Sequence, residues 1–302
     1  MHEINFYGEK LTAYKSACHN HSVASDGKYK PEEIIALYLK KDFDVFAFTD
    51  HRTTNPVSTF DGRGMTLISG IEMHPHGPRG IPWHFLVLGV PEDFPYPSED
   101  DAQAAVDAAK ATGAAVFCAH PYWCGLTSDE VATIKNLDGI EVFNSSCRPI
   151  GRAYNMQTWD ELSDKGLVYP ALAVDDTHGE NHLYKGVTYI VAKDKSPASI
   201  IDALKHGRFY ASQGPTITRL TLEDGVFEAE FSPCTEVIGL TNPSRGYCME
   251  MEDKFGYGSG TREVTSVQIP LRKTEIPLWF RLQLRDAEGH YAWSAPIVYQ
   301  NP

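Results

Sequence analysis

The chain has 302 residues, of which 42% are hydrophobic and 22% are charged, as in an ordinary globular protein with one large domain or a large domain and a small companion. Its formal net charge of −13 at pH 7 disfavours a nucleic-acid duplex or an anionic membrane as partner. No apolar run approaches the roughly 20 residues that span a bilayer, and the first residues show no signal peptide. Six cysteines without a Cys-x-x-Cys motif are too sparse for a disulfide framework, so we expect a cytoplasmic protein.

The first informative stretch is residues 17–27, because residues 1–16 show little pattern. It contains His19, His21 and Asp26. In a strand, side chains at positions i and i+2 point to the same face, so the two histidines would project together, about 7 Å apart. That spacing would let both bind one metal ion. A His-x-His motif on its own is more often a pair of ordinary surface or core histidines.

Predicted helices and apolar strands then alternate along the chain. One helix begins at Pro31, where a proline followed by two glutamates suits a first turn, and another begins at Ser196-Pro197 and ends near Gly207. Further helices are predicted over residues 99–112, 127–137 and 152–165. Apolar strands are predicted over residues 44–48, 66–72, 83–89, 114–119, 139–144, 167–174 and 186–193. Apolar strands that alternate with helices indicate parallel β/α units, covered on both faces.

Polar groups follow at least five of these strands, which is where active-site residues lie in a (β/α) barrel. An open doubly wound sheet also binds ligands at the carboxyl ends of its strands, but usually at one crevice, so the pattern favours the barrel. From about Thr216, alternating stretches separated by turns such as Asp224-Gly225 predict a small antiparallel β-sandwich-like domain. We therefore expect an α/β domain over residues 1–215 and a β-domain over residues 216–302.

Nine ionisable groups at strand ends share the nitrogen and oxygen donors that suit Zn, Mn or Fe. They are His19, His21, Asp26, His51, Glu72, His84, His120, Asp176 and His178. One zinc ion typically takes three or four protein ligands, so nine groups would suit two or three divalent ions. Each group has an ordinary explanation when taken alone, as part of a turn, a loop or a salt bridge. Their shared position after successive strands has no explanation in packing.

These residues resemble the PHP (polymerase and histidinol phosphatase) family across residues 17–180. The resemblance rests on His19-x-His21 with Ser25-Asp26-Gly27, Thr49-Asp50-His51, Gly70-x-Glu72, His84, Ala119-His120-Pro121 and Asp176-x-His178. Residues 207–215 also look like the closing segment of the bacterial two-domain members. The resemblance implies a distorted (β/α)7 barrel that binds up to three divalent metal ions.

By position, the resemblance divides the nine groups among three metals. The first would be held by His19, His21, Glu72 and Asp176, the second by a bridging Glu72 with His84 and His120, and the third by Asp26, His51 and His178. The implied reaction is hydrolysis of a small phosphorylated substrate, a phosphate mono- or diester, by a metal-bridging hydroxide held by Glu72 and Asp176.

Three further side chains are candidates for binding the substrate. Arg148 and Arg152 follow the predicted strand 139–144, and a guanidinium matches phosphate geometry, although arginines on the surface at a helix start explain them equally well. His74 lies in a loop rich in Gly and Pro, where it would contact the substrate or protonate a leaving group, although an exposed loop histidine is the plainer interpretation.

Two carboxylates next to the candidate ligands, Asp50 and Asp175, are expected to orient imidazole N–H groups. The choice between Asp175 and Asp176 as a ligand stays open at this point.

Two other functions remain open. An amide, carbamate or carboxyl-ester hydrolase would use the same metals, with dispensable arginines. A non-catalytic, metal-stabilised binding module would use the β-domain to recognise a partner.

Overall fold

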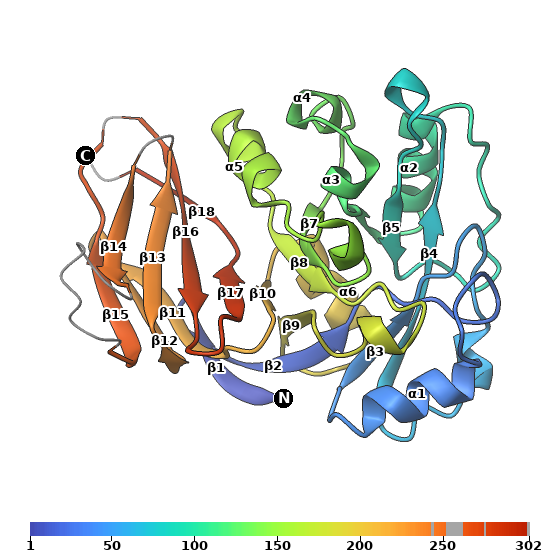
Figure 1. The fold of residues 1–302 in the computed structure, drawn as a ribbon, viewed down its shortest axis with the longest axis horizontal. Coiled ribbons are helices and arrows are strands. Elements are labelled where there is room, and N and C mark those ends of the chain that lie inside the picture. Colours follow the sequence, from blue (N-terminus) through green and yellow to red (C-terminus); the bar gives the residue numbers. More distant parts are fainter. Residues whose placement is uncertain (243–244, 252–261, 275, 301–302) are drawn as a thin grey trace.

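The computed structural model describes residues 1–242, 245–251, 262–274 and 276–300 of a mixed α/β protein (Figure 1). Its described strands are β1 (His2–Phe6), β2 (Glu9–Ala17), β3 (Val45–Phe48), β4 (Thr66–Met73), β5 (Phe85–Leu88), β6 (Ala115–Cys118), β7 (Gly139–Asn144), β8 (Ala171–Val174), β9 (Val187–Ala192), β10 (Phe209–Ser212), β11 (Ile217–Glu223), β12 (Val226–Cys234), β13 (Glu236–Thr241), β14 (Gly246–Glu250), β15 (Val264–Pro270), β16 (Leu278–Arg285), β17 (Tyr291–Ser294) and β18 (Ile297–Tyr299).

The described helices are few and short. They are α1 (Pro31–Leu39), α2 (Ala102–Ala111), α3 (Pro121–Cys124), α4 (Ser128–Val131), α5 (Met156–Asp164) and α6 (Pro197–Lys205), with 3-10 turns η1 (Val57–Thr59), η2 (Pro78–Gly80), η3 (Arg148–Ile150) and η4 (Glu180–His182). Within the described part of the chain, none of these helices is long and apolar enough to cross a membrane.

Helix α1 shows how these sequences form their elements. Pro31 occupies the first turn, and the Glu33 carboxylate accepts the Lys30 backbone N–H at 2.9 Å, which satisfies one of the free donors at the helix start. Ile34 and Tyr38 lie one turn apart on the buried side. The predicted helix beginning at Pro31 is thereby confirmed, whereas the one predicted over residues 127–137 contains only the short α4.

Strand β2 lies next to β9 in the sheet that carries the helices. One edge of β2 pairs with β9, and the other pairs first with β1 and then with β3. The sheet continues from β3 to β4 in parallel, through an antiparallel β5 to β6, and on to β7 and β8 in parallel. The prediction of parallel pairing is therefore wrong for β5 and for β9, which runs antiparallel to β2.

The two ends of this series of strands, β8 and β9, approach each other without a backbone ladder among the described strands. The Thr188 hydroxyl replaces the ladder: it accepts the Ala173 N–H at 3.3 Å and donates to the Ala173 carbonyl at 3.0 Å. A side chain thus satisfies backbone groups of β8 that would otherwise be buried without a partner.

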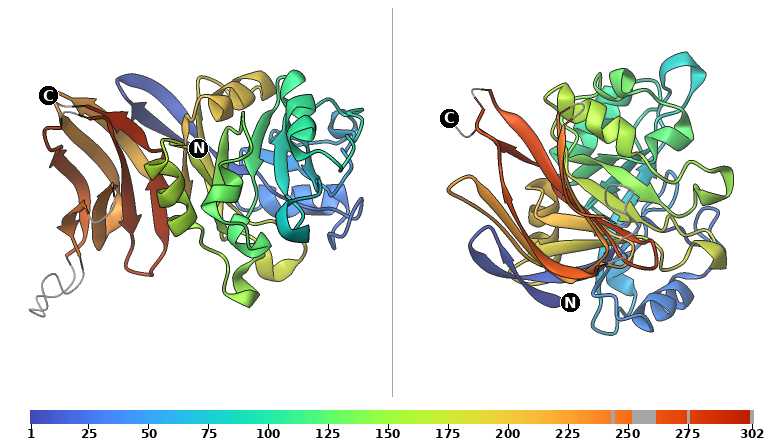
Figure 2. Two further views of the ribbon diagram at one scale, coloured as in Figure 1. Left: turned by 90° about the horizontal axis from the view of Figure 1, so that it is seen from above. Right: turned by 60° about the vertical axis from the view of Figure 1, so that its left-hand side comes forward.

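Strands β11 to β18 form a second region, on the side of the molecule opposite α1 and α2 (Figure 1). They pair as two antiparallel sets, β11–β12–β15 and β14–β13–β16, with β17 and β18 both on β16. Strand β17 also pairs with β10, which pairs with β9, so the sheet runs from one region into the other (Figure 2).

Residues 1–16, for which the sequence shows little pattern, begin with a β-hairpin that joins the two regions. Strand β1 pairs antiparallel with β2 and parallel with β11. Ile4 and Leu11 of the hairpin are buried in the same cluster as Ile217 and Phe227 of the second region.

A buried arginine makes a further junction. Arg281 of β16 is fully buried, and its Nη1 lies 2.5 Å from Asp160 Oδ1 on α5. The guanidinium lies over the Trp159 ring at 4.0 Å and near the Trp279 ring at 5.3 Å. The Trp279 indole N–H in turn donates to Asp164 Oδ1 at 2.7 Å.

Candidate metal centre

One edge of the sheet collects the nine candidate side chains, because the strands that precede them end there. His51 follows β3, and Glu72 lies near the end of β4. His84 comes at the start of its strand, but β5 runs antiparallel, and its first residue lies opposite the last residue of β4 and of β6. The reversed strand therefore brings His84 to the same edge as the others.

The first cluster consists of four atoms that face one another in the interior. His19 Nε2 lies 3.3 Å from Glu72 Oε2 and 3.4 Å from Asp176 Oδ1. His21 Nε2 lies 3.4 Å and 3.0 Å from the same two oxygens. All four atoms are buried and have no hydrogen-bond partner. A buried polar group left unpaired costs about 1–3 kcal/mol, so the arrangement fits a cation that would satisfy all four.

The second cluster uses the other oxygen of Glu72. Glu72 Oε1 lies 2.8 Å from His84 Nδ1 and 3.2 Å from His120 Nε2. The two oxygens of one carboxylate thus serve two adjacent clusters, as in a bridging ligand. The Sγ of Cys124, which the sequence argument passed over, lies 3.6 Å from His120 Nδ1 on the other side of that ring.

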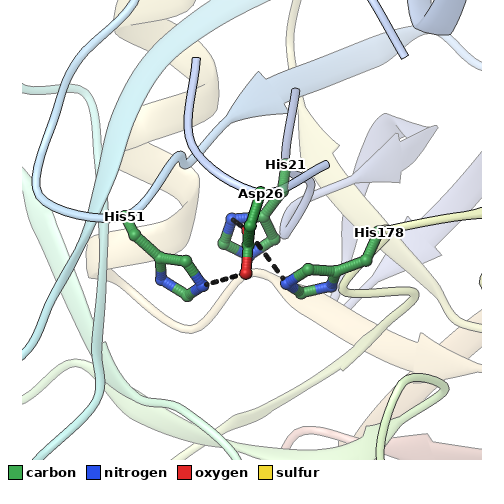
Figure 3. A group of neighbouring side chains, drawn as sticks. All are labelled: His21, Asp26, His51 and His178. Atoms are coloured by element: carbon green, nitrogen blue, oxygen red, sulfur yellow. Dashed lines mark ion pairs between the residues drawn. The ribbon is translucent and has the colours of Figure 1, made fainter. Parts of the chain in front are cut away.

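The third cluster lies around Asp26 (Figure 3). Asp26 Oδ1 lies 3.3 Å from His178 Nε2, and Asp26 Oδ2 lies 3.4 Å from His51 Nε2. The Nδ1 of His21 faces this cluster at 3.9 Å from Asp26 Oδ1, while its Nε2 belongs to the first. The Asp26 side chain is 56% exposed, so this cluster opens to solvent whereas the first does not.

In the buried clusters, the carboxylates and the imidazoles offset the effect of burial on each other's pKa. Burial alone would raise the pKa of Glu72, but His19, His84 and His120 outweigh it and hold that pKa well below the ordinary value. Burial likewise opposes protonation of His19, but the carboxylates around it hold its pKa well above the ordinary value. Burial lowers the pKa of His84 to about 4, so that ring is neutral and able to donate a lone pair.

Two residues that sequence reasoning did not single out as functional support the first cluster. Glu141 of β7 accepts from His19 Nδ1 at 2.7 Å and from the His120 backbone N–H at 2.9 Å. The Asn144 amide donates to Glu141 Oε2 at 2.9 Å and to Asp176 Oδ2 at 3.1 Å. Asn144 is the last residue of β7, and that position at a strand end was the available signal, whereas Glu141 lies in the middle of the strand.

The expected roles of Asp50 and Asp175 in orienting imidazoles are not what the structure shows. Asp50 accepts the N–H and hydroxyl groups of Ser22 and Ser25, and so fixes the loop that carries Asp26. Asp175 accepts the Tyr38 hydroxyl at 2.7 Å and the backbone N–H groups of residues 184–186. Since Asp175 faces away from the histidines, the oxygens that face them are those of Asp176.

A cavity of about 190 Å³ opens onto the clusters. It is lined by Asp26, His51, Glu72, His84, His120, Trp123, Ser146, Cys147, Asp176 and His178. None of these residues is a lysine or an arginine. The Trp123 side chain, 41% exposed, packs at the mouth with its ring centroid 5.2 Å from that of His120.

The three side chains predicted to bind substrate lie outside this lining. Arg148 lines a neighbouring hollow of about 530 Å³ together with Lys185 and His182. Arg152 donates to the carbonyls of Tyr122 and Trp123 and so braces the turn that carries Trp123. His74 is buried behind the cavity wall, where its ring centroid lies 4.0 Å from that of His84.

Taken together, these clusters of His, Asp and Glu have the geometry to hold metal ions at one edge of an α/β sheet. No family model matches the chain, and no curated protein does. Among solved structures, the fold is similar to that of a two-domain protein containing a predicted PHP-like metal-dependent phosphoesterase from Bacteroides vulgatus. That match has a TM-score of 0.50 and 17% identity, and covers 96% of this chain and 95% of the other.

Two further structures match about half of the chain. One is a candidate metal-dependent phosphoesterase from Bifidobacterium adolescentis, with a TM-score of 0.43, 16% identity, and coverage of 55% of this chain and 88% of its own. The other is an amidohydrolase from Chromobacterium violaceum, with a TM-score of 0.43, 16% identity, and coverage of 54% and 87%. The similarity in fold to the Bacteroides protein thus agrees with the resemblance to PHP proteins found in the sequence.

Proposed function

We propose that the protein is a metal-dependent hydrolase that cleaves a small phosphate mono- or diester. The observation that carries this proposal is the set of four unpartnered buried atoms contributed by His19, His21, Glu72 and Asp176. With it we propose a distorted (β/α)7 barrel over residues 1–215 and a β-sandwich-like domain over residues 216–302.

Two or three divalent ions, of Zn, Mn or Fe, would occupy the three clusters. When bound, such ions supply an activated water near neutral pH and neutralise negative charge on the substrate. The chain itself holds Glu72 between two clusters and fixes His19 through Glu141. The carboxylates of Glu72 and Asp176 are ionised in this setting, which matches the donor chemistry of a divalent site.

Arg148 is the cation that we propose for binding an anionic part of the substrate. It lines a hollow whose wall, residues 145–148, also supplies Ser146 and Cys147 to the metal cavity. Lys185 also lines this hollow. Glu180 lines it too and offsets part of the positive charge there. A ligand seated at the metals would therefore need to extend over this shared wall to contact Arg148.

A second candidate function, hydrolysis of an amide, carbamate or carboxyl ester, is favoured by one observation. The lining of the metal cavity contains no lysine or arginine. A phosphate group usually meets positively charged side chains in addition to metals, whereas a neutral carbonyl needs none. This candidate uses the same clusters and differs only in the substrate.

The test combines metal analysis with a substrate panel. Purified protein is assayed for Mn, Fe and Zn content, and then for hydrolysis of p-nitrophenyl phosphate, bis-p-nitrophenyl phosphate and p-nitrophenyl acetate. We expect phosphoester cleavage that is lost in Glu72→Gln and His120→Ala and kept in Arg63→Gln, whose side chain lies on the surface in the loop before β4. Cleavage of the acetate alone would favour the second candidate. A metal-loaded protein inert towards the whole panel would favour a binding module.

A further inference from the structure

His74 lies one residue past β4 and two residues past Glu72. Because side chains at i and i+2 in an extended chain point to the same face, both project towards the centre. The residue is 8% exposed and does not line the cavity. Its ring lies among the nine candidate ligands, although the sequence named it only as a candidate for binding substrate.

The contacts of His74 connect two of the clusters. Its Nε2 lies 2.7 Å from His51 Nδ1, in the third cluster. Its ring stacks on that of His84, in the second cluster, with an interplanar angle of 29°. Behind it, the His74 backbone N–H donates to the Tyr96 hydroxyl at 3.0 Å, and that hydroxyl donates to Glu99 at 2.6 Å. The ring is held on several sides, so it is poorly suited to move with a substrate.

The role of His74 depends on which ring nitrogen of His51 carries the proton. A neutral imidazole carries one proton, so for Nε2 of His51 to offer a lone pair beside Asp26, the proton must be on Nδ1. Two groups lie near that Nδ1: His74 Nε2, at 2.7 Å and in hydrogen-bonding geometry, and Glu72 Oε2, at 2.8 Å but outside hydrogen-bonding geometry.

Glu72 Oε2 is one of the four atoms of the first cluster. A proton donated to it would compete with a cation for the same lone pairs. His74 Nε2 lies 3.6 Å from that oxygen and 2.7 Å from His51 Nδ1, so His51 is its nearest partner.

We propose that His74 is a positioning residue that accepts the Nδ1 proton of His51 and thereby directs His51 Nε2 to the third cation. This inference rests on the metal binding assumed in the proposed function. His74 itself then carries its proton on Nδ1. The consequence is that the third site, which is the most open to solvent, depends on a side chain outside its own ligands.

The experiment measures Mn²⁺ binding to metal-stripped protein, by equilibrium dialysis with metal analysis and by calorimetric titration. The variants are His74→Ala, His74→Gln and His76→Ala. The amide oxygen of Gln replaces the acceptor at Nε2. His76 lies two residues further along and is 71% exposed, which makes it a matched control. Far-UV circular dichroism establishes that each variant is folded.

We expect His74→Ala to lose one Mn²⁺ per chain under conditions that saturate the wild type, through an affinity loss of about 10–100-fold at one site. His74→Gln should recover most of that affinity, and His76→Ala should match the wild type. Equal weakening of all sites in both His74 variants would show a merely structural role and overturn the inference, as would unchanged binding in His74→Ala or a wild type that binds fewer than three ions. A wild type that binds no Mn²⁺ would instead refute the proposed function itself.

Discussion

Replacing Asp160 with asparagine tests how the second region is attached to the first. The variant removes the charge opposite Arg281 with little change in size, and leaves a fully buried guanidinium beside two indole rings. Burial already lowers the pKa of Arg281 and raises that of Asp160, so each charge is costly there without the other.

The magnitude follows from that geometry. Removing one partner of a buried ion pair costs about 3–5 kcal/mol. Asp160 is 35% exposed, so water screens part of the pair and we take the lower end, about 3 kcal/mol. For a chain of this length, that corresponds to a fall in the melting temperature of about 6 °C.

The assay is calorimetric melting, with urea unfolding as an independent measurement. Asp164→Asn is the control, because it affects the neighbouring indole bond of Trp279 without stranding a charge, and should cost under about 1.5 kcal/mol. Combining Asp160→Leu with Arg281→Met should restore most of the stability, since an apolar pair of similar volume is often as stable as a buried ion pair. A loss in Asp160→Asn no larger than in Asp164→Asn would refute this reasoning.

Three further predictions concern the metal centre. Adding Mn²⁺ to metal-stripped protein at 100 times its Kd should stabilise it by about 2.7 kcal/mol, seen as a rise in melting temperature of about 5 °C that EDTA reverses; an unchanged melting curve would contradict it. Glu141→Gln removes the carboxylate that fixes His19 and should weaken Mn²⁺ binding about 10–100-fold in calorimetric titration, whereas native affinity would argue against this role. Arg148→Gln should raise KM for a phosphoester at least about 10-fold with little change in kcat, and equal effects in Arg63→Gln would point to charge alone.

Much of the architecture can be predicted from local sequence patterns. Short apolar runs between helices predict most strands of the first region, because strands buried on both faces read as continuous apolar segments. The candidate side chains stand out because they are polar residues at the ends of those apolar runs. His19 and His21 lie just past the end of β2, but they still project together as the two-residue period of an extended chain predicts, and their Nε2 atoms face the same two oxygens.

The features that the sequence does not reveal depend on contacts between residues far apart in the chain. Strand β5 has the same apolar composition as its parallel neighbours, so nothing local indicates its reversed direction. The role of Glu141 depends on a ring 122 positions away, and a lone glutamate within an apolar strand has many possible partners. Arg148 and Arg152 follow the right strand, but the turn after it directs them away from the cavity.

The hairpin at the amino terminus has a consequence for how the chain is made. Strand β1 pairs with β11, and His2 contacts the Ile217 carbonyl across 215 positions of sequence. At a translation rate of about 5–20 residues per second, β1 is synthesised roughly 10–40 s before that partner. During that interval the edge of β1 that pairs with β11 is free, and a free strand edge is a template for pairing with another chain.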